Sequence, residues 1–153
     1  MEKLNLTQEW DKVFPKSDKV DHRKVTFHNR YGITLAADLY TPKGAGSKLP
    51  AIAVSGPFGA VKEQSSGLYA QKMAELGFFF LAFDPSYTGE SGGTPRYVAS
   101  PDLNTEDFCA AVDFLSVQEN VDPSASAASV SAAGAAWPLT LPPSTPVSRQ
   151  PPP

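Results

Sequence analysis

The composition of this 153-residue chain changes abruptly at residue 123, which limits how much of the chain can build a core. Almost all of its 13 Lys and Arg and its 16 Asp and Glu precede this point, whereas residues 124–153 are mainly Ala, Ser and Pro. Such a segment buries too little apolar surface to offset an ordering entropy of about 1–2 kcal/mol per residue. We therefore expect an N-terminal extension over residues 1–20, a folded portion over residues 21–123 and a disordered tail over residues 124–153.

The whole-chain composition argues against several classes of protein. The formal net charge is −3 and there is no basic tract, so nucleic acid is not an expected partner. The longest strongly apolar stretch, residues 77–83, is far shorter than the roughly 20 residues that span a bilayer, and we expect no membrane partner. The first residues lack the apolar segment of a secretory signal, and the single Cys109 excludes an intrachain disulfide. These features predict a cytoplasmic protein.

Hydrophobic periodicity predicts four strands in the folded portion. Residues 24–28 and 33–40 alternate polar and apolar side chains on either side of turn residues, which is typical of a β-hairpin. Residues 51–54 and 78–83 are short apolar runs, of the kind that is buried on both faces of a parallel sheet. The hairpin is therefore expected to precede a parallel pair of strands.

Two helices are predicted around the second buried strand. Helical spacing begins near Ser66 and ends at Gly77, and a second helix is predicted to begin with a cap at Asn104 or Thr105. In the first helix, Leu68 and similar residues are expected to face the core, and Gln71 to face solvent. The predicted fold is an α/β domain with a mostly parallel sheet that an antiparallel hairpin enters.

Four stretches of the folded portion occur in an order known from one superfamily: residues 25–27, 31–42, 56–63 and 83–93. With these stretches the chain resembles the N-terminal part of an α/β-hydrolase. Within that superfamily it is most similar to the dienelactone-hydrolase-like and Xaa-Pro-dipeptidyl-peptidase-like branch, in which a glycine turn followed by Lys-Glu succeeds the third strand. The resemblance covers about residues 20–123 and implies an incomplete α/β-hydrolase sheet.

The resemblance implies an oxyanion-hole donor in the turn after the third strand, at residues 55–59. Pro57 has no backbone N–H, so the donor would be Phe58 or, failing that, Gly59. Ser55 stands where many relatives have His. The alternative is a plain tight turn without a catalytic role.

Residues 89–93 (Gly-Glu-Ser-Gly-Gly) match the G-x-S-x-G pattern of a nucleophile elbow. An elbow serine lies on a sharp turn directly between a strand and a helix, whereas Ser91 follows a loop and is soon followed by Pro95. We therefore predict that Ser91 is not a nucleophile and that no catalytic residue of a triad is present.

The other candidate residues also favour structural roles. His22 and His28 lie before or within the first strand, away from the carboxyl ends of the parallel strands, where such sheets place their sites. Cys109 lies in an apolar helical run and is interpreted as a packed side chain. Asp84 ends a strand but has no partner evident in the sequence. No metal-ligand spacing or phosphate loop is present, so we predict neither a metal nor a cofactor.

In the family, the nucleophile, the acid and the histidine all lie at positions beyond Pro123 of this sequence. The resemblance therefore implies a truncated hydrolase that is inactive, whose full-length parent acts on a small-molecule ester or peptide. The loss of the fifth strand would leave residues 51–54 as an unpaired sheet edge, and we expect self-association through it.

Residues 124–153 can also be interpreted as the product of a frameshift, in which the DNA of the missing part of the hydrolase is translated in another reading frame. If each codon is read from its third base, Ala becomes Gly, Ser, Cys or Arg, and a TCN Ser codon becomes Ile, Leu, Val or Phe. With permitted codons, the sequence from Ser124 then encodes an apolar strand, a glycine-rich turn and the start of a helix. A frameshift is therefore our hypothesis for the tail, and it leaves open whether the nucleophile is Ser, Cys or absent.

Two other functions remain open at this point. The chain could be a non-catalytic small α/β binding module with a disordered interaction tail. It could also be a miniature esterase that uses Ser91, although no histidine within reach is evident. The sequence does not distinguish an esterase from a peptidase.

Overall fold

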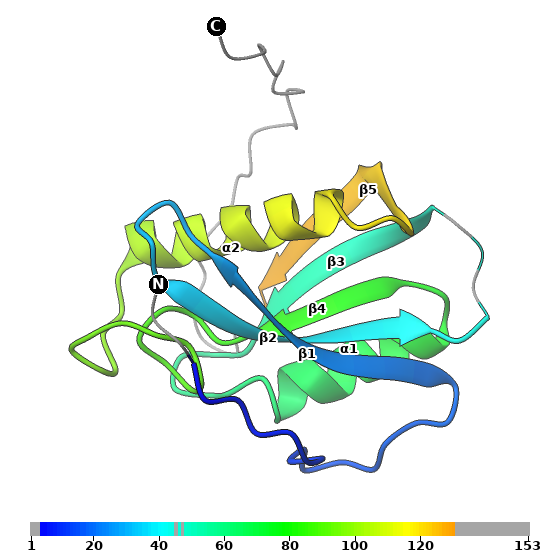
Figure 1. Ribbon diagram of the computed structural model, residues 1–153, viewed down its shortest axis with the longest axis horizontal. Helices are drawn as coiled ribbons and strands as arrows, with labels where there is room; N and C mark the ends of the chain where they lie inside the picture. The colour runs from blue at the N-terminus through cyan, green and yellow to red at the C-terminus, as the bar shows by residue number, and fades with distance from the viewer. Residues whose placement is uncertain (1–3, 45, 47, 131–153) are drawn as a thin grey trace, which may run out of the picture.

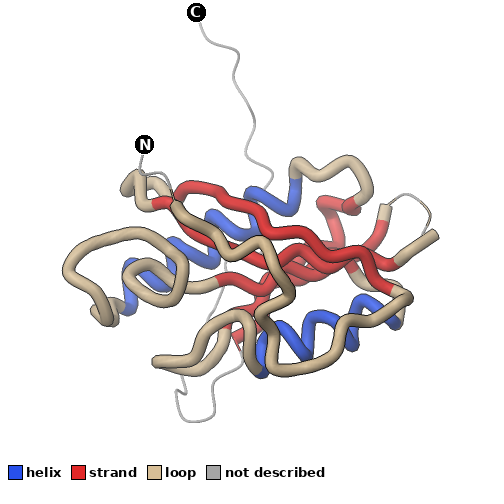
Figure 2. Tube along the Cα trace, turned by 60° about the horizontal axis from the view of Figure 1, so that its bottom comes forward, coloured by secondary structure: helices blue, strands red, loops and turns tan. Residues whose placement is uncertain are grey.

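The computed structural model describes residues 4–44, 46 and 48–130, which form three layers (Figures 1 and 2). The central layer is a five-stranded sheet in the order β1-β2-β4-β3-β5. Helix α1 (Ser65–Glu75) packs on one face and helix α2 (Pro101–Ser116) on the other. The strands are β1 (Val20–His28), β2 (Thr34–Pro42), β3 (Leu49–Ser55), β4 (Phe79–Phe83) and β5 (Val121–Val130).

The strand pairing confirms the predicted α/β architecture. β1 pairs antiparallel with β2, and β2 pairs antiparallel with β4. β3 pairs in parallel with β4, with Ala51 opposite Phe79. The β1–β2 turn therefore lies at the same end of the sheet as the carboxyl ends of β3 and β4. A hydrogen bond of 3.0 Å from Asp84 N to Ala36 O ties these segments together.

The sheet contains one strand more than the sequence predicts. β5 extends to Val130, so residues 124–130 continue a strand where a disordered tail was expected to begin. It pairs in parallel with β3, with Ala51 opposite Ser126 and Ser55 opposite Val130. The rest of the expected tail, residues 131–153, lies outside the described residues.

The extra strand corrects the prediction of an unpaired edge at residues 51–54. β3 lies between β4 and β5, so the edges of the described sheet are β1 and β5. Strand pairing is made by backbone N–H and C=O groups, and a Ser- and Ala-rich strand supplies these as well as an apolar one does.

Both helices differ in detail from the prediction. α2 begins at Pro101, before Asn104 and Thr105, and Asn104 N donates a hydrogen bond of 2.9 Å to Ser100 O in its first turn. Proline suits this position because its fixed φ is helical and the first turn needs no N–H. In α1, Gln71 is buried and Leu68 is exposed, opposite to the predicted faces.

The burial of Gln71 results from the N-terminal segment, which passes over α1. Its amide donates a hydrogen bond of 3.0 Å to Pro15 O and accepts one of 3.1 Å from Ser17 N. A buried amide with both groups satisfied is stable next to apolar neighbours. The N-terminal extension is thus part of the folded body.

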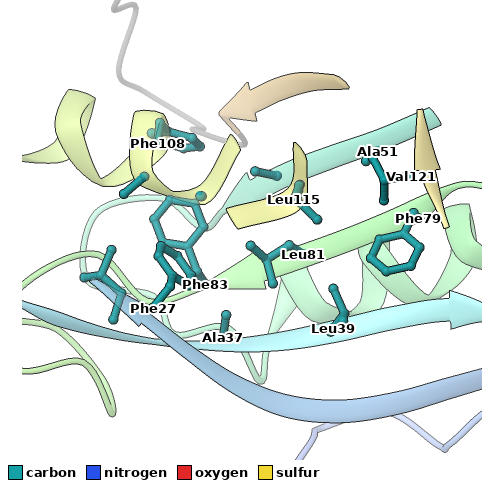
Figure 3. Packing of buried hydrophobic residues seen from close by; sticks show 14 residues of the cluster. Phe27, Ala37, Leu39, Ala51, Phe79, Leu81, Phe83, Phe108, Leu115 and Val121 are labelled. Atoms are coloured by element: carbon teal, nitrogen blue, oxygen red, sulfur yellow. The ribbon is translucent and has the colours of Figure 1, made fainter. Parts of the chain in front are cut away.

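Two apolar clusters hold the layers together. The cluster beside α1 contains Val54, Ala74 and Phe80. The larger cluster lies between the sheet and α2 (Figure 3). Its labelled members are Phe27, Ala37, Leu39, Ala51, Phe79, Leu81, Phe83, Phe108, Leu115 and Val121. None of the described helices is long and apolar enough to cross a membrane.

Leu81→Ala should lower the free energy of unfolding by about 2–5 kcal/mol, because Leu81 is fully buried in a central strand and truncation leaves a cavity. Leu76→Ala removes the same atoms from a side chain that is 72% exposed, and we expect a change within about 0.5 kcal/mol. Urea unfolding followed by circular dichroism measures both variants. Equal losses would contradict the described packing.

Candidate functional site

The carboxyl ends of β3 and β4 define the candidate site. The β3–α1 loop (residues 56–64) and the β4–α2 loop (residues 84–100) both leave the sheet at this edge, beside the β1–β2 turn. Open α/β sheets place their ligand sites at the carboxyl ends of parallel strands, where helix N-termini and loop amides converge. Functional side chains and backbone amides are therefore expected at this edge.

The β3–α1 loop presents two backbone amides at this edge. Ala60 N donates a hydrogen bond of 2.9 Å to Pro57 O, which closes a tight turn around Phe58 and Gly59. Within the described residues, the amides of Phe58 and Gly59 have no hydrogen-bond acceptor. Gly59 has a φ of +85°, which few residues other than glycine adopt. The turn lies at the carboxyl end of β3, where the oxyanion donor is predicted, and the donor role of either amide stays a prediction.

Ser91 has a structural position in the β4–α2 loop. Its side chain is buried, and Oγ donates a hydrogen bond of 2.7 Å to Asp84 O and accepts one of 2.8 Å from Ala36 N. The next helix begins only at Pro101. A hydroxyl committed to two backbone partners in a loop fits the prediction that Ser91 is not a nucleophile.

Asp84 has a partner that the sequence analysis missed, which is Lys62. Lys62 Nζ lies 2.9 Å from Asp84 Oδ2, and Lys62 N donates a hydrogen bond of 2.8 Å to Oδ1. Both side chains are fully buried. Burial raises the pKa of the Asp84 carboxyl, and the charge of Lys62 opposes this effect. The Lys62-Glu63 pair after the glycine turn was the available sequence signal for this contact. If Lys62 is buried, its ammonium group needs a carboxylate partner.

Gly89 is required for this arrangement. Its φ is +53°, and a Cβ at this position would lie 2.2 Å from Asp84 Oδ2. Such a distance is far inside van der Waals contact, so any larger residue would displace the carboxylate. One glycine of the G-x-S-x-G match thus makes room for Asp84.

The Lys62 ion pair is part of a wider network. Lys62 Nζ also contacts Glu63 at 2.5 Å and Glu90 at 2.8 Å. Glu90 accepts a hydrogen bond of 2.7 Å from Lys24 Nζ on β1, and Lys24 in turn lies 2.7 Å from Asp11. The network therefore connects both site loops to β1 and to the N-terminal segment.

The network continues away from the site. Lys12 Nζ is buried and lies 2.6 Å from Asp11 and 3.1 Å from the Asp38 carboxylate. His22 Nε2 lies 2.8 Å from Asp38 Oδ1. His22 is paired in register with Tyr40, toward the end of β2 that is remote from the β1–β2 turn. It is therefore far from the Phe58 turn, in agreement with the predicted structural role.

His28 is exposed and ends β1 at the same end of the sheet as the β4–α2 loop. It remains separated from β3 by β2 and β4. Three strand spacings correspond to about 14 Å, too far for an imidazole to reach a group beside the Phe58 turn.

Three carboxylates of the network lie as close together as the ligands of a metal ion would. Oxygen atoms of Asp11, Glu63 and Glu90 lie within 4.8 Å of one another. The ammonium groups of Lys24 and Lys62 already bind them at hydrogen-bond distance. Because two ammonium groups already bind these oxygens, the cluster is best described as an ion-pair network.

A second polar cluster fastens α2 to the site edge. Asp107 Oδ1 accepts hydrogen bonds of 2.8 Å from Ser86 Oγ and from Asn29 Nδ2, and Oδ2 accepts one of 2.8 Å from Ser86 N. Burial raises the pKa of the Asp107 carboxyl. Cys109, two residues after Asp107 in α2, is partly buried, and burial raises the pKa of its thiol. A thiol of this kind is a poor nucleophile.

A cavity of about 550 Å³ lies at the opposite end of the sheet. It is lined by residues of the β1 and β4 starts and of the α2–β5 connection, including His22, Phe79 and Gln118. This is the amino end of β4, so the cavity is separate from the carboxyl edge that carries the Phe58 turn.

The mixed sheet, the covering helices and the loops at the carboxyl edge together define the chain as part of an α/β-hydrolase. A family model described as X-Pro dipeptidyl-peptidase (S15 family) matches residues 31–140, and the chain belongs to this family.

The relatives share the N-terminal part of this fold. Protein PA2218 of Pseudomonas aeruginosa is 76% identical over 120 residues, which are 78% of this chain and 32% of the relative. YcjY of Escherichia coli is 44% identical over 105 residues, which are 66% of this chain and 34% of YcjY. A thiohydrolase, aneE, of Aspergillus aculeatus is 34% identical over 71% of this chain and 33% of its own length.

A solved structure agrees with this relationship. The crystal structure of PA2218 superposes with a TM-score of 0.81 at 70% identity, covering 84% of this chain and 40% of that one. The chain thus spans about a third of the length of the relatives that it matches.

Lys62→Met should lower the free energy of unfolding by about 3–5 kcal/mol, because it leaves the buried Asp84 carboxylate without a counter-charge and removes one of the two ammonium partners of Glu90. The control is Lys72→Met, since the ammonium of Lys72 is 3.2 Å from Glu75 at the surface and such pairs contribute about 0–1 kcal/mol. Urea unfolding at neutral pH measures both. A loss at Lys62 no larger than that at Lys72 would disprove the role of the network.

Acid should weaken the fold through Asp11 and Glu90. Burial acts to raise their pKa values, but hydrogen bonds and charges from the neighbouring lysines outweigh it and lower both pKa values to about 2, from ordinary values of 3.8 and 4.5. Their contribution to stability is present above the ordinary values and is lost as the pH falls toward about 2. Urea unfolding at a series of pH values should show this loss.

Glu90→Gln should flatten that part of the pH profile, because the glutamine side chain does not titrate. Glu119→Gln is the matched control, since Glu119 is exposed outside the network. An unchanged slope in Glu90→Gln would show that the acid sensitivity arises elsewhere.

Proposed function

We propose that the chain forms the N-terminal part of an α/β-hydrolase domain whose full-length form cleaves ester or peptide bonds, and that the chain alone is inactive. The observation that carries the proposal is the exposed turn at Phe58 and Gly59, whose amides have no acceptor among the described residues. The family match and a relative named as a thiohydrolase support hydrolytic chemistry. The glycine turn followed by Lys62-Glu63 favours the dienelactone-hydrolase-like and Xaa-Pro-dipeptidyl-peptidase-like branch.

In such a hydrolase, the turn would bind the negatively charged oxygen of the tetrahedral intermediate. A backbone N–H aimed at this oxygen contributes about 3–4 kcal/mol to the transition state. Ser55 at the end of β3 is opposite Val130 at the end of β5, so a nucleophile that follows β5 would lie beside the turn. The hydrogen bond from Lys62 N to the Asp84 carboxylate would fix the loop that carries the turn.

Inactivity of the chain follows from the residues available as a base. The sequence contains two histidines, and both belong to β1. Neither one is near the Phe58 turn.

The purified chain should not hydrolyse p-nitrophenyl esters or aminoacyl anilides above the buffer rate. Ser91→Ala should leave that rate unchanged, because Ser91 Oγ is bound to backbone groups. Release of p-nitrophenol or of aniline is measured by absorbance, with the full-length form of PA2218 as a comparison. Turnover that disappears in Ser91→Ala would overturn the proposal and favour a miniature esterase.

We further infer that the segment from Ser124 results from a frameshift in the coding DNA. Its support is the abrupt loss of charge at this point and a permitted alternative frame that encodes a strand, a glycine-rich turn and a helix start. Sequencing the DNA from the Asp122 codon onward tests this hypothesis. A long open frame containing later Asp and His codons is expected, and frames that close quickly would contradict it.

A binding module without catalytic function is the second candidate. It is favoured by the packing of the described residues, in which helices cover both faces of the sheet and β5 pairs with β3. If the DNA has no other open frame, the tail is authentic and this function gains support. Affinity capture with the intact chain and with residues 1–130 would then identify a partner that needs the tail.

A further inference from the structure

The N-terminal strap (residues 4–17) lies on the face of the sheet that carries α1 and contains no helix or strand. Its anchors are individual side chains. Phe14 is buried in the cluster beside α1, and the buried ammonium of Lys12 lies 3.1 Å from the Asp38 carboxylate. The strap is therefore attached to the body at separate points and not through strand pairing.

The strap contacts both loops of the candidate site. Thr7 N donates a hydrogen bond of 2.8 Å to Glu90 Oε1 in the β4–α2 loop, and Val13 N donates one of 3.3 Å to Glu63 O in the β3–α1 loop. The carboxylates of Glu63 and Glu90 lie 2.5 and 2.8 Å from Lys62 Nζ. The strap thus holds the two loops at the residues whose side chains neutralise Lys62.

Phe14 also lies close to the backbone of Lys62. A Cβ at Gly67, in the first turn of α1, would lie 3.2 Å from Phe14 Cζ and 2.3 Å from Lys62 O. The ring and the carbonyl group therefore lie against the same point of the helix, where a larger residue would separate them. This contact joins the main apolar anchor of the strap to the β3–α1 loop.

The body keeps a core that does not involve the strap. None of the described members of the larger cluster, between the sheet and α2, belongs to residues 4–17. Leu81 and Phe83 of β4 are fully buried in that cluster. Segments without backbone pairing open at a lower free energy than core strands. The strap can therefore leave the body while the sheet and α2 remain packed.

We propose that the N-terminal strap opens as a unit while the sheet stays folded, and that this opening releases the β3–α1 and β4–α2 loops. Opening removes the strap contacts of Glu63 and Glu90. It also lets water reach the ammonium of Lys62, which weakens the ion pairs that order both loops. The order of the candidate site then depends on a segment outside it, and this inference does not depend on catalysis.

Amide hydrogen exchange of the full chain, followed by NMR at low urea concentrations, tests the proposal. Three amides report on the opening: Val13 N, which binds Glu63 O, and the amides of Lys62 and Glu90, which bind the Asp84 carboxylate. They should share one opening and exchange on the order of tenfold faster, relative to their intrinsic rates, than the amides of β2 and β4. Three different openings, or one opening shared with β2 and β4, would overturn the proposal.

Two matched variants distinguish opening of the strap from unfolding of the chain. Phe14→Leu should accelerate exchange at the three reporter amides by about threefold or more, by a common factor, because the open strap no longer packs this side chain. Phe108→Leu makes the same change in the larger cluster, which stays packed when the strap opens. It should accelerate exchange in β2 and β4 and leave the three reporter amides unchanged.

Asp11→Asn is a second strap variant that leaves the apolar packing intact. It weakens the contacts of Asp11 with Lys12 and Lys24, so the three reporter amides should again exchange faster by a common factor. Asp21→Asn is its control, because Asp21 is exposed and lies 3.9 Å from Lys43. Circular dichroism identifies the folded variants.

The loop amides decide the outcome. Faster exchange at Val13 alone in a folded strap variant would show that the loops do not depend on the strap. Faster exchange at the Lys62 and Glu90 amides in Phe108→Leu would show that they open only when the chain unfolds. Either result would overturn the proposal, whereas joint acceleration in the strap variants without acceleration in Phe108→Leu supports it.

Discussion

A fully buried ammonium group must be surrounded by carboxylates, and Lys62 imposes this requirement on both loops of the candidate site. Its partners come from the end of β4 and from the β4–α2 loop, while its own backbone N–H binds Asp84. A shift of either loop would leave an unpaired charge in the interior. The buried Lys62–Asp84 pair therefore fixes the position of the loop that carries the Phe58 turn, although the Phe58 side chain is exposed to solvent.

The same requirement explains why the N-terminal segment is folded. Glu90 neutralises Lys62 and also binds Lys24 and the backbone amide of Thr7. Lys24 needs a further carboxylate, which Asp11 provides. Each charge brought into the interior thus requires another from a different segment, and the series of pairs ends where His22 contacts Asp38 in the middle of β2.

Local patterns in the sequence were sufficient for the hairpin, the two buried strands and the position of the Phe58 turn. These features depend on neighbouring residues, such as alternating apolar side chains and a turn of Gly and Pro. Local patterns did not predict the partner of Asp84, because Lys62 lies 22 positions away in the sequence. Gln71 was assigned to the wrong face of α1 for a related reason, since its burial depends on Pro15 and Ser17. Side-chain type alone does not reveal which polar group will find a distant partner.

β5 shows the limit of composition as a guide. Its Ser- and Ala-rich sequence has low strand propensity, yet β3 presents a row of backbone groups that any extended segment can satisfy. In a parallel sheet the neighbours in space are separated in the chain, so β5 follows β3 only after α1, β4 and α2. A site at the carboxyl edge is therefore built from widely separated segments. The described residues place the Phe58 turn at this edge and support it through the Lys62–Asp84 ion pair. The shared fold, with 76% identity to PA2218 over the matched residues, thus establishes common ancestry for this part of the sheet.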